Sequence, residues 1–315
     1  MLGYLSRRLL QGILVMFLVS AATFFLINLA PGGPSSLMNL NSTAQQRAAL
    51  EQQLGLNRPI FLRYLNWLGA ALQGRLGNSL SQGEPVAPLL AQRLRHTALL
   101  AGTALLLVFI FGVALGIWSA RKRGRPIDHL VGLVSTLGMS LPEFWLGTLL
   151  IMLFSVRLHF LPASGMLTVG APWSLSDLLV HLLMPALVLS FVLLPNVVRF
   201  ARSALLEVME ADYVRTARSK GLRERAVLLR HALRNAWIPI IAMLGLILPQ
   251  LLSGSVVVES VFAWPGMGRL AVQAAMNRDY PVIMATTVLA AAIVILTNIL
   301  IDLLYSLVDP RVVHA

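Results

Sequence analysis

The sequence predicts an all-α, polytopic membrane protein with six transmembrane helices, and three observations support this. Of the 315 residues, 57% are apolar and only 12% are charged, about half the charged share of a soluble domain. The mean hydropathy is +0.77. The apolar residues also gather in runs of about 20, the length that a helix needs to cross a bilayer. The composition excludes a soluble enzyme and a disordered chain, and the lack of cysteine excludes disulfides.

Six apolar runs account for the six predicted helices. None shows an alternation of period two, so we expect helices rather than the strands of a barrel. The third run is interrupted only by Glu143, and the fourth is the shortest and contains Pro185 and Pro195. The first run is too long for a typical signal peptide, so we expect an uncleaved first helix. In chain order the runs are residues 9–30, 97–120, 130–156, 182–198, 236–258 and 281–301.

The basic residues predict the orientation of these helices. If the N-terminus is cytoplasmic, the inner segments hold 16 of the 25 lysine and arginine residues, although the outer segments are longer. This asymmetry fits the positive-inside rule and places both termini in the cytoplasm. It also argues against nucleic-acid binding, which the net charge of +12 could suggest, because the charge is spread over separate loops. The inner segments are 1–8, 121–129, 199–235 and 307–315.

The chain is predicted to have three parts. Residues 1–30 form an N-terminal segment with the first transmembrane helix, and residues 31–96 form an extracytoplasmic helical loop region. Residues 97–315 form a core of five transmembrane helices with a cytoplasmic loop at 199–235. A connection as long as 31–96 should carry structure of its own.

Two helices are predicted in this outer region. Thr43 followed by Gln46 has the spacing of a capping box and predicts a helix over 44–54. Tyr64 and Trp67 suit the membrane interface, beside an apolar stripe with helical spacing. The second helix either covers the bundle at that interface or docks an extracytoplasmic partner. The stripe consists of Phe61, Leu65, Leu68 and Leu72.

The inner loop 199–235 is predicted to hold two short helices folded back on each other. In its first segment acidic residues come early and basic residues late, as the helix dipole favours. Gly221 stands where that helix should end, since glycine tolerates a positive φ. A second amphipathic segment leads into the fifth span at Pro239. From spacing alone, the charged face is either solvated or a docking surface.

Glu143 is the charged residue inside a predicted span, where charge is costly. On a straight helix it would lie about 20 Å from the start of the third run, past the middle of the bilayer. It either lines a central cavity and attracts a cationic group, or is a structural carboxylate that pairs with a partner subunit or water.

Further signals lie in and between the spans. Gly112 and Gly116 have the spacing of a helix-packing motif, which favours packing within the bundle over a dimer contact. Trp264 and Met267, in the outer loop before the sixth span, form part of an outer gate, a dock for a partner, or a simple re-entrant turn.

The chain contains no recognised catalytic motif. Its only lysines, Lys122 and Lys220, lack the preceding glycines of a phosphate-binding loop. The six histidines are too scattered for a local metal motif, and no Gly-x-Ser-x-Gly segment occurs. We therefore predict no catalytic, cofactor or metal site in this chain.

The inner loop carries a family resemblance. Residues 211–222, Ala-Asp-Tyr-Val-Arg-Thr-Ala-Arg-Ser-Lys-Gly-Leu, resemble the "EAA" loop of ABC-transporter permeases, in the dipeptide/oligopeptide/nickel branch of binding-protein-dependent importers. The chain departs from the general motif in having Arg215 and Thr216 before Ala217, a variant that itself resembles the peptide branch. Glu143 stands where the branch more often has a neutral residue. Residues 53–59, 140–147, 258–270, 277–283 and 309–311 match the same branch.

The resemblance implies a type I ABC importer permease-like bundle in the bacterial inner membrane. It implies a homologous second permease, two ATPases that bind ATP and Mg²⁺, and an extracytoplasmic solute-binding protein. The substrate would be a di- or oligopeptide, with nickel, a metallophore or glutathione as alternatives; a channel or secondary transporter without an ATPase is the rival of another class. The coupling loop would consist of Ala211, Asp212, Tyr213, Arg215, Thr216, Ala217, Arg218, Lys220 and Gly221.

Overall fold

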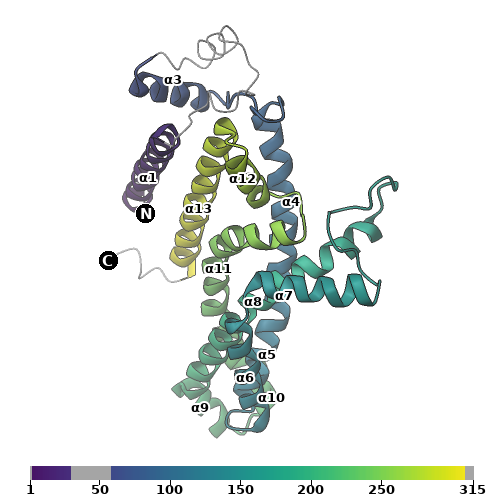
Figure 1. The fold of residues 1–315 in the computed structure, drawn as a ribbon. Coiled ribbons are helices and arrows are strands. Elements are labelled where there is room, and N and C mark those ends of the chain that lie inside the picture. Colours follow the sequence, from purple (N-terminus) through teal and green to yellow (C-terminus); the bar gives the residue numbers. More distant parts are fainter. Residues whose placement is uncertain (1, 30–57, 309–315) are drawn as a thin grey trace. The chain divides into compact units, whose positions relative to one another are not determined.

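The computed structural model describes residues 2–29 and 58–308, and these are mostly helical (Figure 1). The predicted helix over 44–54 and the motif at 309–311 lie outside these residues. Within them, the one extended pairing is an isolated bridge between Asn78 and Pro85. The α-helices are α1 (Leu2–Leu29), α3 (Ile60–Leu72), α4 (Val86–Leu107), α5 (Val113–Arg121), α6 (Pro126–Ser140), α7 (Glu143–Leu150), α8 (Leu175–Glu210), α9 (Asp212–Ser219), α10 (Glu224–Ala226), α11 (Leu233–Val261), α12 (Met267–Met276) and α13 (Tyr280–Val308). Three π-helical segments join them, η2 (Val108–Gly112), η3 (Ile151–Arg157) and η4 (Val227–Ala232).

The chain forms two compact units. The first consists of Met1–Arg95 and Arg269–Leu296, and the second of His96–Gly268 and Thr297–Ala315. The predicted coupling loop lies in the second unit, as do Glu143, Trp264 and Met267.

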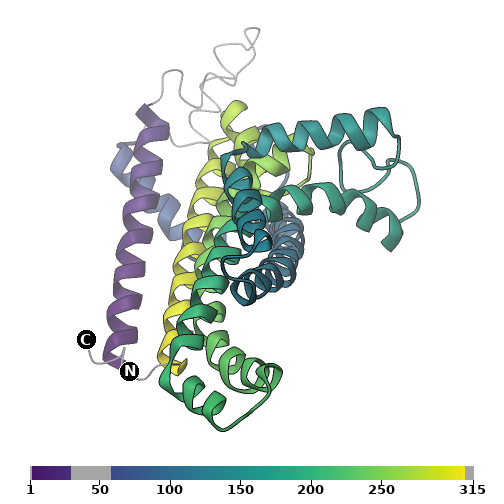
Figure 2. The ribbon, with the colours of Figure 1, turned by 90° about the horizontal axis from the view of Figure 1, so that it is seen from below.

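In the first unit, α3 packs on α1 through Tyr64. The aromatic ring of Tyr64 has its centroid 5.9 Å from that of Phe17 and 5.5 Å from that of Phe24, and its hydroxyl is 2.9 Å from Ser20 Oγ. Helices α1 and α13 run side by side (Figure 2), and they approach closely at Gly12. A Cβ on Gly12 would lie 2.7 Å from Ile295 Cγ2, so only glycine fits there without a shift.

The amphipathic helix predicted around residues 61–72 is confirmed, but its packing face differs from the expected one. Tyr64, which the sequence suggested for the membrane interface, is instead the buried residue of α3. Phe61, Leu65 and Leu72 of the predicted stripe are exposed within the unit. The apolar spacing therefore predicted the helix correctly, whereas the aromatic face decides how the helix packs.

In the second unit, α8 is the central helix, and α5, α6, α7 and α11 pack against it. It is 36 residues long, although the predicted run covered only residues 182–198. Pro185 and Pro195 lie inside it without ending it. The buried core takes Leu189, Val197 and Leu205 from this helix.

The predicted glycine packing motif lies on α8. A Cβ on Gly112 would lie 2.9 Å from Val197 Cβ, and one on Gly116 would lie 2.7 Å from Ala201 Cβ. Both positions therefore need glycine for the close approach of α5 and its preceding turn to α8. This confirms that the motif serves packing within the bundle.

The predicted spans are borne out in part. Among the described residues, four helical stretches are long and apolar enough to cross a membrane, or five if a bent pair counts as one span. Helix α11 covers the fifth predicted run but is not among them, so the number of six remains a prediction, as does the orientation of the termini. The stretches are Ser6–Leu29, Val86–Arg121, Leu175–Glu210 and Tyr280–Ile301, with Pro126–Ser140 and Glu143–Arg157 as the bent pair.

The third predicted run is not one straight helix. It breaks between α6 and α7, which are bent by 99°. Leu141 has extended backbone angles, φ −88° and ψ 125°. The cause is Pro142, because proline lacks an N–H donor and disfavours helical angles at the residue before it. The prediction of one straight third span is therefore wrong, whereas the depth of Glu143 in the bilayer stays a prediction.

Candidate functional site

The predicted coupling helix is present as α9, between two sharp changes of backbone direction. Ala211 is extended, with φ −68° and ψ 148°, and separates the end of α8 from the start of α9. Gly221 has φ +75°, which confirms that glycine ends this helix. Asp212 lies in the first turn and Arg218 in the last, as the helix dipole favours.

One face of α9 is buried against the protein's own chain. Val214 and Ala217 pack with Val227 of η4, and Val208 of α8 joins this small core. The small side chain of Ala217 therefore permits close approach within the loop itself. Val214 is a residue that the sequence interpretation missed, although its spacing of three from Ala217 is the signal of a helix face.

The other face of α9 is exposed, and we call Arg215, Thr216 and Ser219 its outer face. Ser219 lies four positions after Arg215 and three after Thr216, so it is a neighbour of both on the helix surface. Tyr213 and Lys220 are also exposed. Ser219 was not among the predicted coupling-loop residues, although it lies on α9 between Arg218 and Lys220, which were.

Two solvent-exposed ion pairs lie in this loop. Arg215 Nη1 lies 3.5 Å from Asp212 Oδ1. Arg218 Nε lies 2.8 Å from Glu224 Oε1, and its Nη1 donates to the carbonyl oxygen of Met209. Arg218 thus contacts the segments before and after α9, through side chains that are themselves exposed.

The second predicted helix of the loop is not a separate short helix. The chain is helical from Glu224 through η4 into α11 without a break. Because α9 packs on η4 and follows α8 after one extended residue, a force on α9 acts directly on two long helices, α8 and α11. Helices α8, α9 and α11 and the segment η4 all lie in the second unit (Figure 1).

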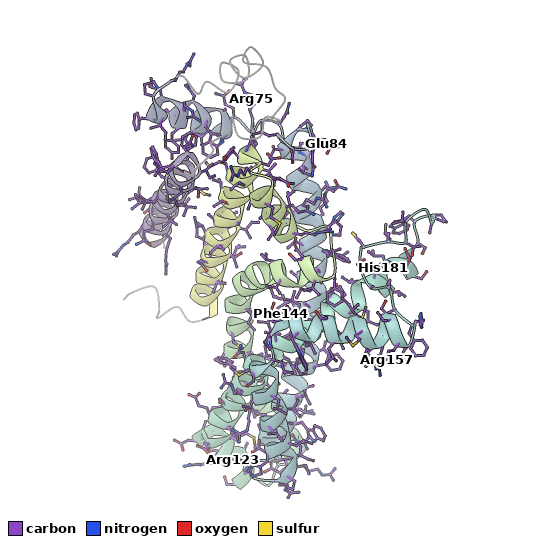
Figure 3. All side chains as sticks on the ribbon, viewed as in Figure 1. Arg75, Glu84, Arg123, Phe144, Arg157 and His181 are labelled. Carbon is purple, nitrogen blue, oxygen red and sulfur yellow. The ribbon has the colours of Figure 1, made fainter. Side chains whose placement is uncertain are left out.

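Glu143 begins α7 at the break of the third predicted span. Its side chain is partly buried, and its Oε2 has no hydrogen-bond partner among the described residues. The neighbouring Phe144, labelled in Figure 3, is exposed on α7. A carboxylate oxygen that is shielded and unsatisfied within one chain indicates that a partner, water or substrate completes it.

Trp264 and Met267 are both buried in the second unit. Trp264 Nε1 donates to the carbonyl oxygen of His96 at 3.0 Å, and the N–H of Met267 donates to Thr97 Oγ1 at 2.8 Å. Thr97 Oγ1 in turn donates to the buried Glu259 at 2.6 Å. The loop that holds the two predicted gate residues is therefore hydrogen-bonded to α4 at both of them, and Thr97 connects it to Glu259 of α11.

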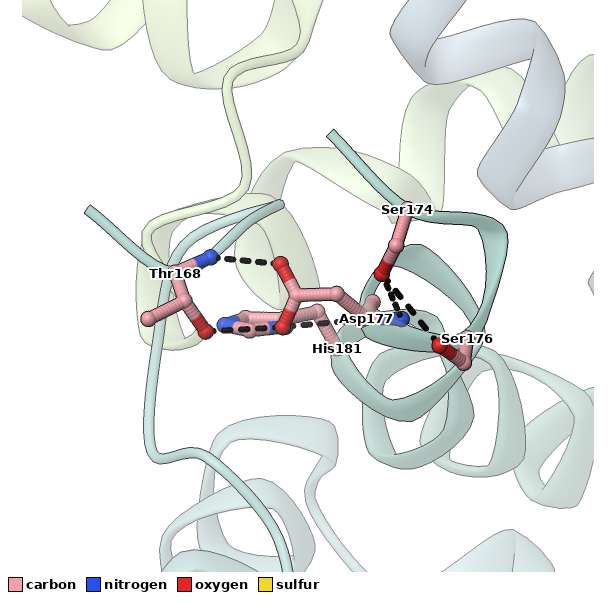
Figure 4. Close-up of polar contacts among 5 residues, drawn as sticks. All are labelled: Thr168, Ser174, Ser176, Asp177 and His181. Atoms are coloured by element: carbon pink, nitrogen blue, oxygen red, sulfur yellow. Dashed lines mark hydrogen bonds and ion pairs between the residues drawn. The ribbon is translucent and has the colours of Figure 1, made fainter. Parts of the chain in front are cut away.

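A second segment that is held by hydrogen bonds precedes α8 (Figure 4). The N–H and the hydroxyl of Thr168 each donate to the carboxylate of Asp177 at 2.7 Å, and His181 Nδ1 lies 3.3 Å from the same carboxylate. Ser174 caps α8 by accepting from the N–H of Asp177. His181 thus has a local structural partner, and no metal-binding group of three acidic, histidine or cysteine residues occurs among the described residues.

Comparisons with known proteins agree with the resemblance. Residues 112–314 match the family "Binding-protein-dependent transport system inner membrane component", and residues 1–106 match "Binding-prot-dependent transport system membrane comp, N-term". The chain is 40% identical over 314 residues to the "Oligopeptide transport system permease protein AppB" of Bacillus subtilis, covering 99% of each chain. It is 41% identical over 313 residues to the "Glutathione transport system permease protein GsiC" of Escherichia coli K12, again with 99% of each chain.

A solved structure has a similar fold. A chain of the inward-facing "MetNI methionine ABC transporter" matches with a TM-score of 0.55 at 18% sequence identity. The match covers 70% of the present chain and 96% of the other. At this identity the likeness concerns the fold alone.

Proposed function

Because the chain belongs to the family of binding-protein-dependent transport system inner membrane components, we propose that it is the permease subunit of an ATP-driven importer of di- or oligopeptides. In this proposal it forms the translocation path together with a homologous second permease. Two ATPases bind ATP and Mg²⁺ on the cytoplasmic side, and a solute-binding protein delivers the substrate from outside. The site of action is the bacterial inner membrane.

The observation that carries the coupling role is the two-sided character of α9. Its inner face is fixed by Val214 and Ala217, while Arg215, Thr216 and Ser219 point away from the chain that holds them. A short helix that is rigidly held on one side and polar on the other can seat in a groove of an ATPase. When ATP closes the ATPases, the helix moves as a rigid body and the bundle rocks between inward- and outward-facing states.

The experiment is to purify the reconstituted complex with altered outer faces of α9. We expect Arg215→Glu and Ser219→Trp to lower the amount of ATPase that co-purifies, and to lower ATP hydrolysis stimulated by the binding protein. Ser203→Trp, an exposed position on α8, is the matched control and should change neither. Full co-purification of the ATPase with both α9 variants would contradict the coupling role, and no ATPase on the native chain would contradict the importer.

Glutathione is the second candidate substrate, because the glutathione permease of E. coli is as similar to this chain as the oligopeptide permease of B. subtilis is. Glutathione is itself a tripeptide, so one path suits both. Stimulation of the complex by binding protein loaded with peptides, glutathione or a nickel chelate separates these candidates. A response to the nickel chelate alone would overturn the peptide proposal.

Glu143 is our candidate for the translocation path. Its unsatisfied carboxylate oxygen, next to the break at Pro142, is suited to the ammonium group of a peptide. In the reconstituted complex, Glu143→Gln should reduce the amount of peptide transported. It should also shift the preference among peptides of different charge. Unchanged transport and preference would assign Glu143 a structural role, completed by the second permease or by water.

A further inference from the structure

We propose that Asp128 is a positioning residue that joins α5, α6 and α8 into one rigid lever, through which movement of α9 reaches the membrane spans. This inference rests on the proposed coupling role of α9. Asp128 is buried near the start of α6 and belongs to none of the sequence motifs described above.

Both oxygens of the Asp128 carboxylate accept hydrogen bonds, and the donors come from three segments. Arg202 of α8 binds it in a two-pronged arrangement, with Nε donating to Oδ1 and Nη2 to Oδ2, each at 2.8 Å. The hydroxyl of Ser119 on α5 donates to Oδ1. The N–H of Gly124, in the turn between α5 and α6, donates to Oδ2 at 3.0 Å. Such paired, charge-assisted bonds fix orientation as well as distance.

The ion pair lies at the end of a close-packed contact that η2 and α5 make with α8. Gly112 meets Val197 and Gly116 meets Ala201, and Ser119 lies three residues further along the same face. Glycine contacts alone allow one helix to slide or roll on the other. The bond from Ser119 to Asp128 and the Arg202 fork prevent this, because each helix then has a fixed partner at the end of this contact.

Asp128 lies on α6 and therefore connects α6 to α5 and α8. A second contact between α6 and α8 lies near the other end of α6. Gly138 of α6 packs on Pro195 and Phe191 of α8. Beyond Ser140 the chain turns at the 99° break before α7. Helix α9 follows α8 after Ala211 alone. A push on α9 is thus carried by α8 to α5 and α6 together, and the bend before Glu143 is the first point at which the chain can change direction.

A second ion pair on the same turn offers a matched control. Arg123 Nη1 lies 2.7 Å from Glu210 Oε1, but their side chains are 62% and 66% exposed. Figure 3 shows Arg123 at the end of the unit. Each pair connects α8 to α6 or to the turn before it, but only the pair of Asp128 with Arg202 is shielded from water. An exposed pair contributes little to rigidity, because water and salt screen it.

The first experiment measures coupling in the reconstituted complex with both permeases, both ATPases and the binding protein. For Asp128→Asn and Arg202→Lys we expect the ATPases to co-purify as with the native chain, while substrate moved per ATP falls about tenfold. Arg123→Ala should stay within about twofold of the native chain. Native coupling in both lever variants would overturn the proposal. If Asp128→Asn fails to assemble, Arg202→Lys, which keeps the charge and loses the fork, decides the question.

The second experiment tests the lever without transport. Because the chain has no cysteine, spin labels at Thr136→Cys on α6 and Ser203→Cys on α8 report one distance. Both positions are exposed. We expect one narrow distribution, the same with and without ATP, that broadens in Asp128→Asn and not in Arg123→Ala. A width that Asp128→Asn leaves unchanged would overturn the lever, whereas loss of ATPase binding by the native chain would instead overturn the proposed function.

Discussion

At the scale of single residues, buried carboxylates hold the loops of this protein in place. Asp279, just before α13, accepts hydrogen bonds from the hydroxyls of Ser79 and Ser81 and from the N–H groups of Leu80 and Ser81. Burial by itself raises the pKa of this carboxyl, but the four hydrogen-bond donors outweigh burial and lower the pKa below its ordinary value of 3.8. The ionised form of Asp279 therefore stabilises the first unit.

The pH dependence follows from the sign of this shift. A carboxyl whose pKa is lower in the folded chain stabilises the fold above its unfolded-state pKa, and the stabilisation is lost as the pH falls through the folded-state pKa. We expect the melting temperature in detergent to fall on acidification below about pH 4, and Asp279→Asn to weaken that dependence. Asp279→Asn should also cost about 1–3 kcal/mol at neutral pH. Glu84→Gln, an exposed carboxyl in the same loop, is the control; an identical pH profile in both variants would contradict the role of Asp279.

These carboxylates also show why part of the site escaped prediction. Helix α9 and the stop at Gly221 depend on residues a few positions apart, so charge order and glycine placement predicted them. The bonds of Asp128 to Arg202, of Thr97 to Glu259 and of Ser79 to Asp279 join positions 74, 162 and 200 residues apart. Hydropathy and spacing describe only neighbours in sequence, and therefore give no sign of such pairs.

At the scale of elements, the positions of helices were predicted correctly, but the faces through which the helices pack were not. Apolar runs located α1, α8 and α13, because a helix in a membrane must be apolar over most of its length. The break before α7 was readable in Pro142, yet the unbroken apolar run outweighed it. In α3 the apolar stripe predicted the helix, but the side chain that fixes it on α1 is the aromatic Tyr64.

Tyr64 should therefore determine whether α3 stays on α1. Its ring contacts Phe17 and Phe24, and its hydroxyl contacts Ser20. We expect Tyr64→Ala to destabilise the first unit by about 3–5 kcal/mol, the usual cost of removing a buried aromatic ring, and to open α3 to limited proteolysis. Phe61→Ala, on the same helix but 60% exposed, should change stability by less than about 0.5 kcal/mol. Equal protease sensitivity of the two variants would show that the aromatic contact does not hold α3.

At the scale of the whole molecule, low overall charge and a net charge of +12 have one common explanation. The apolar excess forms the spans, and the basic excess is concentrated in the segments that we predict to be cytoplasmic. The same loop that carries nine basic residues, 199–235, also carries α9. Orientation and coupling are thus linked, since an ATPase can reach α9 only if this loop is cytoplasmic.

The orientation can be measured directly because the chain has no cysteine of its own. Single cysteines at Ser219→Cys on α9 and at Val169→Cys in the segment before α8 are both exposed, so a thiol reagent that cannot cross membranes will report the side of each. In intact cells stripped of the outer membrane we expect Val169→Cys to react and Ser219→Cys to remain unlabelled until the membrane is opened. Inside-out vesicles should give the reverse, which controls for reactivity. If both cysteines react from the same side, the positive-inside assignment is wrong, and α9 loses its access to a cytoplasmic ATPase.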